Sequence, residues 1–207
     1  MPGILRGAAR GRKGRGASRA IPAAIGAALL AATSASSGDL ACERAMARAS
    51  AANGVPLNVL YSVGLTETGQ RGELGQYDMN VDGRAVRSVN LSEAIARFAA
   101  EKARGARFID IGCMQINHHF HGSRFASVAA MFDPAANVDY AAGFLKALKA
   151  EVGTWTLAVA RYNAGPNNPV AEQRYVCAVI RNMVASGFGR WTPNARALCG
   201  GRETALR

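Results

Sequence analysis

Between residues 40 and 185 the sequence is a succession of helical patterns, most of them bounded by a glycine, a proline or a capping residue. Helices are expected at residues 40–53, 56–67, 90–104, 133–151, 155–162 and 168–185. The helical pattern is interrupted at 77–89, where a strand-like run precedes the turn pair Asp82-Gly83, and again by a short strand at 108–111. The sequence therefore predicts a predominantly helical α+β domain with one small antiparallel sheet.

The composition is that of a folded chain with an excess of positive charge. Hydrophobic residues make up 49% of the 207 residues, enough to build a core, and the formal net charge is +11. Six basic residues and no acid lie in 1–35, so the rest of the chain carries about +5. A mild positive charge suits an anionic partner such as a cell-wall polymer. We expect no nucleic-acid partner, because that prediction would rest on charge alone.

The N-terminal 35 residues have the order of a secretory signal peptide. A basic segment comes first, residues 21–32 are apolar, and the small residues Thr33, Ser34 and Ala35 follow. We expect cleavage near Ala35 and a periplasmic or otherwise exported protein. The apolar run is shorter than the ~20 residues of a membrane-spanning helix, so no stable membrane span is expected after removal of the signal. The alternative is a disordered basic arm.

Four cysteines in an exported chain suggest two disulfides. They are Cys42, Cys113, Cys177 and Cys199, and four cysteines allow three connectivities. We favour Cys177–Cys199, both in the C-terminal segment, together with Cys42–Cys113. The alternative is four reduced, buried thiols in a cytosolic protein. The chain has no CxxC pair, so a thioredoxin-like or zinc-binding role is disfavoured.

Three segments carry the strongest functional signal. They are Gly-Leu-Thr-Glu-Thr-Gly at 64–69, Asp-Ile-Gly-Cys-Met-Gln-Ile-Asn at 110–117 and Ala-Arg-Tyr-Asn-Ala-Gly-Pro at 160–166. In this order and at these separations they resemble the lysozyme-like lytic transglycosylases of the soluble lytic transglycosylase type. Thr68 stands where that family usually has Ser, and Cys113 stands where it usually has Leu. The resemblance implies a lysozyme-like domain over 36–200, followed by a C-terminal tail at 201–207.

Glu67 is the candidate general acid. Cleavage of a glycosidic bond needs a carboxylic acid that is still protonated near neutral pH, because the leaving oxygen must receive a proton. Glu67 ends a helical stripe that contains Leu60 and Val63. Apolar surroundings raise the pKa of a carboxyl, because desolvation disfavours its charged form. The alternative is an exposed glutamate at a helix end.

Asp110 separates two mechanisms. The pattern at 110–117 also resembles the animal-type lysozymes, which have their second carboxylate at this place. A retaining hydrolase needs such a partner at about 5 Å from the acid. The resemblance to lytic transglycosylases implies instead one Glu, assistance by the N-acetyl group of the substrate, and a 1,6-anhydro product. Asp110 is therefore a candidate catalytic residue or a strand-end Asp that binds backbone N–H groups.

The resemblance also indicates the residues that contact substrate: Thr68, Met114, Gln115, Asn117, Tyr162 and Asn163. We expect Thr68 to orient Glu67, Met114 to form an apolar wall, and Tyr162 to stack on a sugar or to bind Glu67 through its hydroxyl.

The three histidines of the chain lie close together, at positions 118, 119 and 121, but no Cys, Asp or Glu is interleaved at ligand spacing. We expect no metal and no cofactor.

The residues and the resemblance together predict an exported peptidoglycan lytic transglycosylase. It would cleave the β-1,4 bond between N-acetylmuramic acid and N-acetylglucosamine in the glycan strands, with Glu67 as acid and then base. One alternative is a hydrolytic muramidase that uses Glu67 and Asp110. Another is a non-catalytic wall-binding scaffold, against which the complete motif set argues. The resemblance also suggests a secretion or flagellar apparatus as a partner.

Overall fold

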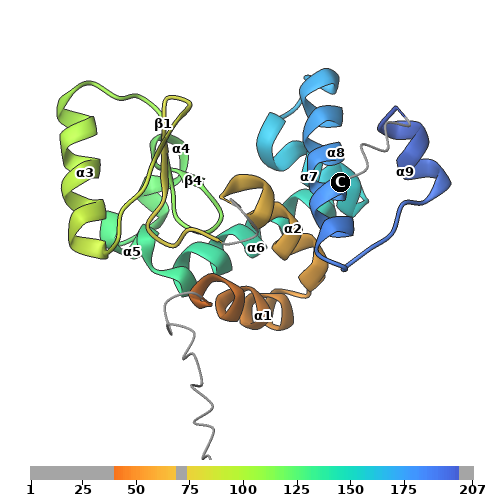
Figure 1. Cartoon of the computed structure of the whole chain (residues 1–207), viewed down its shortest axis with the longest axis horizontal. Helices are drawn as coiled ribbons and strands as arrows, with labels where there is room; N and C mark the ends of the chain where they lie inside the picture. Colours follow the sequence, from red (N-terminus) through yellow and green to blue (C-terminus); the bar gives the residue numbers. More distant parts are fainter. Residues whose placement is uncertain (1–39, 69–73, 201–207) are drawn as a thin grey trace, which may run out of the picture. The chain divides into compact units, whose positions relative to one another are not determined.

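The computed structural model describes residues 40–68 and 74–200, which belong to one compact unit (Figure 1). In this part of the chain there are nine α-helices, one short 3-10 helix and four strands. The helices are α1 (Ala41–Asn53), α2 (Leu57–Glu67), α3 (Leu91–Ala103), α4 (His118–His121), α5 (Val128–Phe132), α6 (Pro134–Val152), α7 (Trp155–Ala164), α8 (Pro169–Ala185) and α9 (Pro193–Leu198). The strands are β1 (Met79–Val81), β2 (Arg84–Val86), β3 (Ile109–Ile111) and β4 (Ile116–Asn117), and the 3-10 helix is η1 (Gly122–Arg124). The predicted signal peptide at 1–35 and tail at 201–207 lie outside the described residues.

The long helices begin and end where the sequence predicts. Gly54 caps α1 in the left-handed region, with φ +69°, which a glycine adopts without steric cost. The Asn90 side chain accepts a hydrogen bond from the backbone N–H of Glu93 and opens α3, and the Glu93 carboxylate accepts one from the N–H of Val89. The predominantly helical α+β class is confirmed.

The four strands form one antiparallel sheet in the order β2-β1-β3-β4. The turn at Asp82-Gly83 joins β1 to β2, as expected, and the Asp82 carboxylate also accepts a hydrogen bond from the N–H of Phe108 (2.9 Å). Side chains alternate between the two faces of a strand, so the buried residues Ile109 and Ile111 place Asp110 on the opposite face. Asp110 pairs with Asn117 of β4 in the register of the sheet.

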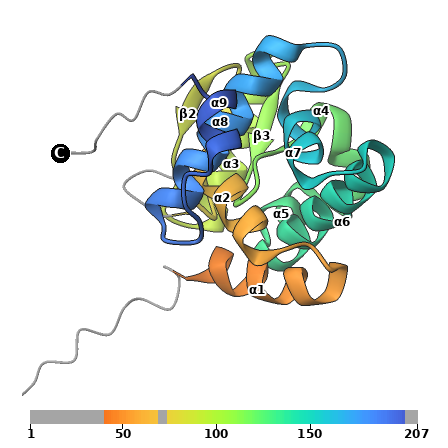
Figure 2. The ribbon, with the colours of Figure 1, turned by 90° about the vertical axis from the view of Figure 1, so that its right-hand side faces the viewer.

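Helix α2 packs between the helix that precedes it and a helix about 100 residues further along the chain. It packs on α8 and on α1, while α1 also packs on α6 (Figure 2). At the contact between α1 and α2, a Cβ at Gly64 would stand only 2.3 Å from the Met46 side chain. Both residues are buried. Because Gly64 has no Cβ, the two helices can approach this closely. The position of the last turn of α2, which carries Glu67, is therefore set by tertiary packing.

Four short elements follow no pattern that the sequence reveals: β4, α4, α5 and α9. Each has six residues or fewer, too few to display a periodicity.

Two disulfides join distant elements, Cys42 of α1 to Cys113 between β3 and β4, and Cys177 of α8 to Cys199 after α9. These are the two pairs that we favoured. No helix in the described ranges is both long and apolar enough to cross a membrane.

Candidate active site

Glu67 is the last residue of α2, and its carboxyl group is enclosed by protein although the residue keeps some exposed surface. The Tyr175 hydroxyl, on α8, donates a short hydrogen bond to Oε1 of Glu67. The pKa of Glu67 is raised from 4.5 to about 7: burial is the largest cause, the hydrogen bond from Tyr175 opposes it, and the negative charge of Asp110 adds a smaller rise. The net result is a carboxyl group that changes protonation near neutral pH.

Thr68 follows Glu67, and its hydroxyl contacts backbone groups. It lies 3.2 Å from the carbonyl oxygen of Gly64 and 3.4 Å from that of Cys113, and it accepts a hydrogen bond from the N–H of Gly75. The expectation that Thr68 orients Glu67 by hydrogen bonding is therefore wrong, because the hydroxyl is directed to these three backbone groups. Thr68 instead joins the end of α2 to the turn between β3 and β4.

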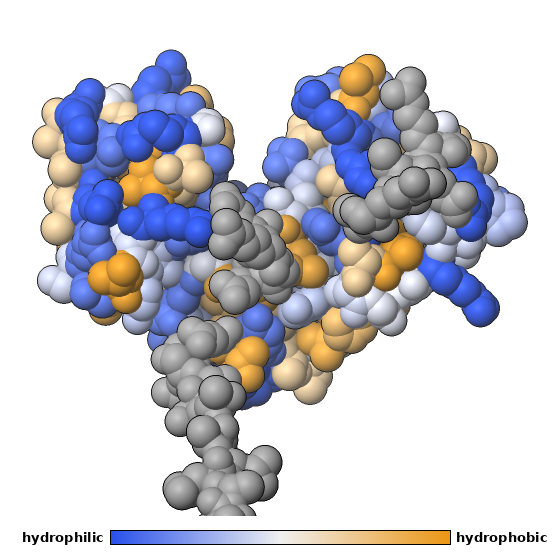
Figure 3. Space-filling model, in the orientation of Figure 1, coloured by the Kyte–Doolittle hydropathy of each residue, from blue (hydrophilic) through white to orange (hydrophobic). Residues whose placement is uncertain are grey.

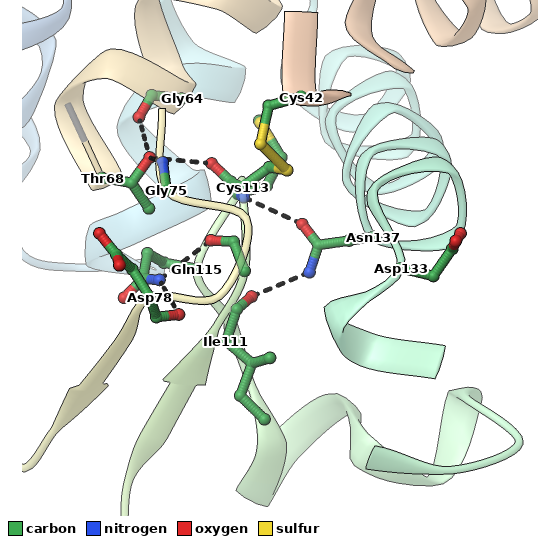
Figure 4. The surroundings of a disulfide bond; sticks show 12 residues. Cys42, Gly64, Thr68, Gly75, Asp78, Ile111, Cys113, Gln115, Asp133 and Asn137 are labelled. Atoms are coloured by element: carbon green, nitrogen blue, oxygen red, sulfur yellow. Dashed lines mark hydrogen bonds between the residues drawn. A yellow bond between two sulfur atoms is a disulfide. The ribbon is translucent and has the colours of Figure 1, made fainter. Parts of the chain in front are cut away.

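The turn between β3 and β4 is anchored by Asn137 of α6, which is fully buried (Figure 4). Its amide nitrogen donates to the carbonyl oxygens of Ile111 (2.8 Å) and Met131 (2.9 Å), and its oxygen accepts from the N–H of Met114 (2.9 Å). At Gly112, which has φ +76°, a Cβ would lie 2.9 Å from the Asn137 amide nitrogen, so the turn approaches α6 too closely for any larger residue.

Within this turn, Met114 and Gln115 have different environments. The Met114 side chain is fully buried in the core, so the expectation that it forms an apolar wall of the substrate cleft is wrong. The next residue, Gln115, has φ +46° and lines the cleft. Its amide nitrogen donates to the carbonyl oxygens of Gly112 (3.0 Å) and Asp78 (3.2 Å), which fixes the side chain against the sheet.

Asp110 lies in the same cleft as Glu67. The Asn117 amide nitrogen donates to the Asp110 carboxylate at 2.6 Å, and the Asn117 oxygen accepts from the backbone N–H groups of His119 and Phe120 at the start of α4. Burial raises the pKa of Asp110, and the hydrogen bond from Asn117 lowers it in part. Asp110 is thus a half-buried carboxylate, held in position and directed into the cleft.

The cleft has a volume of about 260 Å³ and draws its lining from α2, the sheet, α4, α6 and α7. It is lined by Glu67, Asp110, Gln115, Ile116, Asn117, Phe120, His121, Phe144, Tyr162 and Asn163. A smaller hollow of about 50 Å³ shares Glu67 and Gln115 with it and is also lined by Thr68, Asp78 and Arg87. Figure 3 shows the surface hollowed between the part that carries α3 and the sheet and the part that carries α7 and α8. Glu67 therefore lines two adjoining depressions.

Tyr162 and Asn163 line the cleft from the end of α7. The Tyr162 hydroxyl donates to the carbonyl oxygen of Met114 (2.9 Å), and the bond to Glu67 that we considered for it is made by Tyr175. The ring of Tyr162 remains at the cleft, where it adjoins Phe144.

Sequence reasoning missed Tyr175, Asn137, Phe120 and Phe144. Asn137 and Tyr175 lie in helices whose other buried residues are apolar, and a polar residue at such a position was the one available signal.

The three histidines contact different aromatic partners: His118 contacts Phe98, His119 contacts Phe108, and His121 binds the Tyr140 hydroxyl at 2.8 Å.

Comparison with known proteins agrees with this geometry. Residues 80–179 match the family model of the transglycosylase SLT domain, which is consistent with a lysozyme-like lytic transglycosylase. The family implies the enzyme class of lytic transglycosylases, which act on peptidoglycan. The matched range begins after Glu67 and includes Asp110, Gln115, Tyr162 and all of the sheet except Met79. Comparison with curated proteins and with solved structures found no match.

Proposed function

We propose that the protein cleaves the β-1,4 bond between N-acetylmuramic acid and N-acetylglucosamine with Glu67 as its catalytic residue and releases a 1,6-anhydro product. The observation that carries this proposal is the enclosed carboxyl of Glu67 in a cleft, with its pKa raised to about 7. A carboxyl of this kind is partly protonated at neutral pH, so it supplies the proton that the leaving oxygen requires.

In the first half of the reaction Glu67 acts as an acid. The bond between C1 of N-acetylmuramic acid and the glycosidic oxygen breaks, and the proton of Glu67 passes to that oxygen, which becomes the 4-hydroxyl of the departing N-acetylglucosamine. The N-acetyl group of the muramic acid assists at C1. Tyr175 stabilises the Glu67 carboxylate that results, because its hydroxyl donates to Oε1.

In the second half Glu67 acts as a base. The 6-hydroxyl oxygen of the same sugar forms a bond to C1 as the bond between C1 and the assisting N-acetyl oxygen breaks, and the hydroxyl proton returns to the Glu67 carboxylate. The bond closes the 1,6-anhydro ring, no water is consumed, and the enzyme regains its starting protonation state. Gln115 and Asn163 line the cleft beside Glu67, so the side-chain oxygen of Gln115 and the amide group of Asn163 are placed to meet the hydroxyl and N-acetyl groups of the sugars.

The second candidate function is hydrolysis by two carboxylates, and the position of Asp110 in the cleft favours it. In that mechanism Asp110 would act as nucleophile or would stabilise the cation at C1, and water would give a reducing sugar. We rank it second because Asp110 has a structural role in the register of the sheet, where it accepts from Asn117.

The products distinguish the two functions. Purified sacculi are treated with the wild-type protein, Glu67→Gln and Asp110→Asn, and the released muropeptides are analysed by mass spectrometry. We expect anhydro-muropeptides from the wild type and from Asp110→Asn and none from Glu67→Gln. Reducing products that disappear in both variants would establish the two-carboxylate muramidase. A folded wild type that releases nothing would point to a non-catalytic wall-binding scaffold.

We also propose that the protein acts outside the cytoplasm. Support comes from the signal-like order of residues 1–35 and from the two disulfides, since disulfides persist in oxidising compartments. The positive charge favours binding to the anionic wall. The family resemblance further supports a role in opening the wall for a secretion or flagellar apparatus.

A further inference from the structure

The outer side of α8 carries cations that the proposed chemistry does not use. One stripe of the helix consists of Val170, Arg174, Cys177 and Arg181. Successive members of this stripe are four, three and four residues apart, so they lie on the same side of the helix. The other side of α8 packs on α2 and α7 and holds the buried residues Tyr175 and Val179. The stripe is therefore the side of α8 that is turned away from the core.

The disulfide between Cys177 and Cys199 brings α9 to this stripe. The Gln173 amide nitrogen donates to the carbonyl oxygen of Leu198, so the end of α9 lies beside the first half of α8. Arg196 comes three residues before Cys199, about one helical turn away, and adds a cation close to the disulfide. We call the resulting surface the α8–α9 face, and it consists of Val170, Arg174, Arg181, Arg196 and Leu198.

The α8–α9 face is cationic. Residues 173–200 contain four arginines and no lysine, aspartate or glutamate. Glu172, which precedes this segment, pairs with Arg161 of α7 at 3.4 Å, so its negative charge is already compensated. Arg174 and Arg181 are exposed, and neither forms an ion pair within the described part of the chain. The face therefore presents a positive potential to any anionic partner.

Exposed apolar side chains accompany these cations. Val170 at the start of α8 is 75% exposed, and Leu198 of α9 is 38% exposed. A polyanion in water is attracted by cations alone. The surface of an anionic lipid bilayer accepts both kinds of side chain, because its headgroups meet the arginines while apolar groups enter the boundary with the acyl chains. Arginine stems also pack along such apolar groups while the guanidinium remains at the headgroups. The mixture favours a lipid surface as the partner.

The α8–α9 face is turned away from the cleft. None of the described residues that line the cleft belongs to α8 or α9. In both views of the ribbon, α9 lies on the side of α8 that is remote from the sheet (Figure 1, Figure 2). A protein attached through this face would keep its cleft open to a polymer.

We propose that the α8–α9 face is a docking surface for an anionic lipid bilayer and holds the protein at the membrane surface without spanning it. Arg174 and Arg181 meet the anionic headgroups, and Val170 and Leu198 enter the boundary with the acyl chains. The inference goes beyond the proposed reaction and does not depend on it, because no residue of the face takes part in proton transfer.

Binding to lipid vesicles tests this proposal. The protein is purified from the exported fraction of expressing cells, so that it carries the N-terminus that it has after export, and all variants share that N-terminus. Vesicles of phosphatidylcholine alone are compared with vesicles of equal parts of phosphatidylcholine and phosphatidylglycerol, and bound protein is measured by co-sedimentation. The variants are Arg174→Gln/Arg181→Gln, Arg174→Lys/Arg181→Lys, Val170→Ser and the control pair Arg48→Gln/Lys146→Gln.

The control pair removes the same two charges from other helices. Arg48 lies on α1 and Lys146 on α6. Both are exposed, and neither forms an ion pair among the described residues. The comparison therefore separates the effect of this face from that of the net charge. Thermal unfolding of each variant checks that the fold is kept.

We expect the wild type to bind the anionic vesicles, to leave the neutral ones unbound, and to bind more weakly as the salt concentration rises. Arg174→Gln/Arg181→Gln weakens binding about thirtyfold, because each cation near an anionic bilayer contributes about fivefold. The lysine pair keeps the charge and retains binding. Val170→Ser weakens binding about threefold, because its side chain no longer enters the lipid boundary. The control pair binds nearly as the wild type does.

Three results would overturn the proposal: no binding of the wild type to anionic vesicles, an equal loss in the control pair, or full vesicle binding by Arg174→Gln/Arg181→Gln. A fourth result would assign the face to an acidic polypeptide instead. In that case polyglutamate binding is lost with the two arginines, while Val170→Ser binds vesicles as well as the wild type does.

The outcome is separable from that of the proposed function. Arg174→Gln/Arg181→Gln should release muropeptides from sacculi at the wild-type level, since neither residue lines the cleft. Cleavage without lipid binding by the wild type would overturn the docking surface alone. Lipid binding through the two arginines, combined with no released products from the wild type, would overturn the catalytic proposal and retain the docking surface.

Discussion

At the scale of single residues, the proposed chemistry depends on the environment of one carboxyl. Burial and Asp110 raise the pKa of Glu67, and the hydroxyl of Tyr175 opposes the rise because it stabilises the charged form. A general acid must be protonated, so activity falls as the pH rises through the pKa of Glu67. In the wild type we expect the alkaline limb of the kcat/KM profile to have its midpoint near pH 7.

Removal of the Tyr175 hydroxyl is predicted to move that limb. In Tyr175→Phe the Glu67 carboxylate loses a hydrogen-bond donor, so its charged form is less stable, its pKa rises, and the alkaline limb shifts to higher pH. The measurement is kcat/KM against pH for Tyr175→Phe and for Tyr61→Phe, a control whose ring packs on Phe188. A limb that stays in place, or moves to lower pH, would show that Tyr175 does not tune the acid.

At the scale of elements, the active site depends on the attachment of α6 to the turn between β3 and β4. Asn137 makes all three of its hydrogen bonds to backbone groups of Ile111, Met114 and Met131. An alanine at this position would leave buried backbone groups without partners in an interior that water does not reach. Gln115, which follows Met114, would then lose the support that sets its position in the cleft.

We therefore predict that Asn137→Ala lowers the free energy of unfolding by about 3 kcal/mol, since several buried polar groups lose their partners together. The measurement is urea unfolding of Asn137→Ala beside Asn53→Ala. Asn53 also donates to a carbonyl oxygen and to a side chain, but it is only partly buried and water can replace its bonds, so its loss should cost less than about 1 kcal/mol. Equal losses in the two variants would contradict the anchoring role of Asn137.

At the scale of the whole molecule, two disulfides connect segments that are distant in the chain. Cys42–Cys113 spans 71 residues and ties α1 to the turn of the site, and Cys177–Cys199 spans 22 residues and ties α9 to α8. A cross-link stabilises the folded state mainly by restricting the unfolded chain, and the restriction grows with the length of the closed loop.

Replacement of each pair by alanines should reveal this difference. We predict a loss of about 4 kcal/mol for Cys42→Ala/Cys113→Ala and about 3 kcal/mol for Cys177→Ala/Cys199→Ala, from the chain entropy of the two loops. Urea unfolding of the oxidised wild type and of both double variants measures the losses. A greater loss from the 22-residue loop would refute the entropic account for this protein.

The sequence by itself determined the class of fold, the bounds of the long helices and the position of the main hairpin. These features have local causes: capping side chains such as Asn90, the conformational freedom of Gly54, and the spacing of apolar residues along each helix. It also indicated Glu67, Asp110, Gln115, Asn117, Tyr162 and Asn163, all of which line one cleft.

Only the tertiary structure decided which groups meet. It showed that Tyr175 contacts Glu67 from 108 residues away, that Asn137 holds the turn from another helix, and that the Met114 side chain is buried in the core. It likewise brought together the rings of Phe120, His121, Phe144 and Tyr162 from α4, α6 and α7. A local pattern specifies which face of a helix is apolar, but the partner of that face depends on how all the elements pack together, and no short segment encodes that packing.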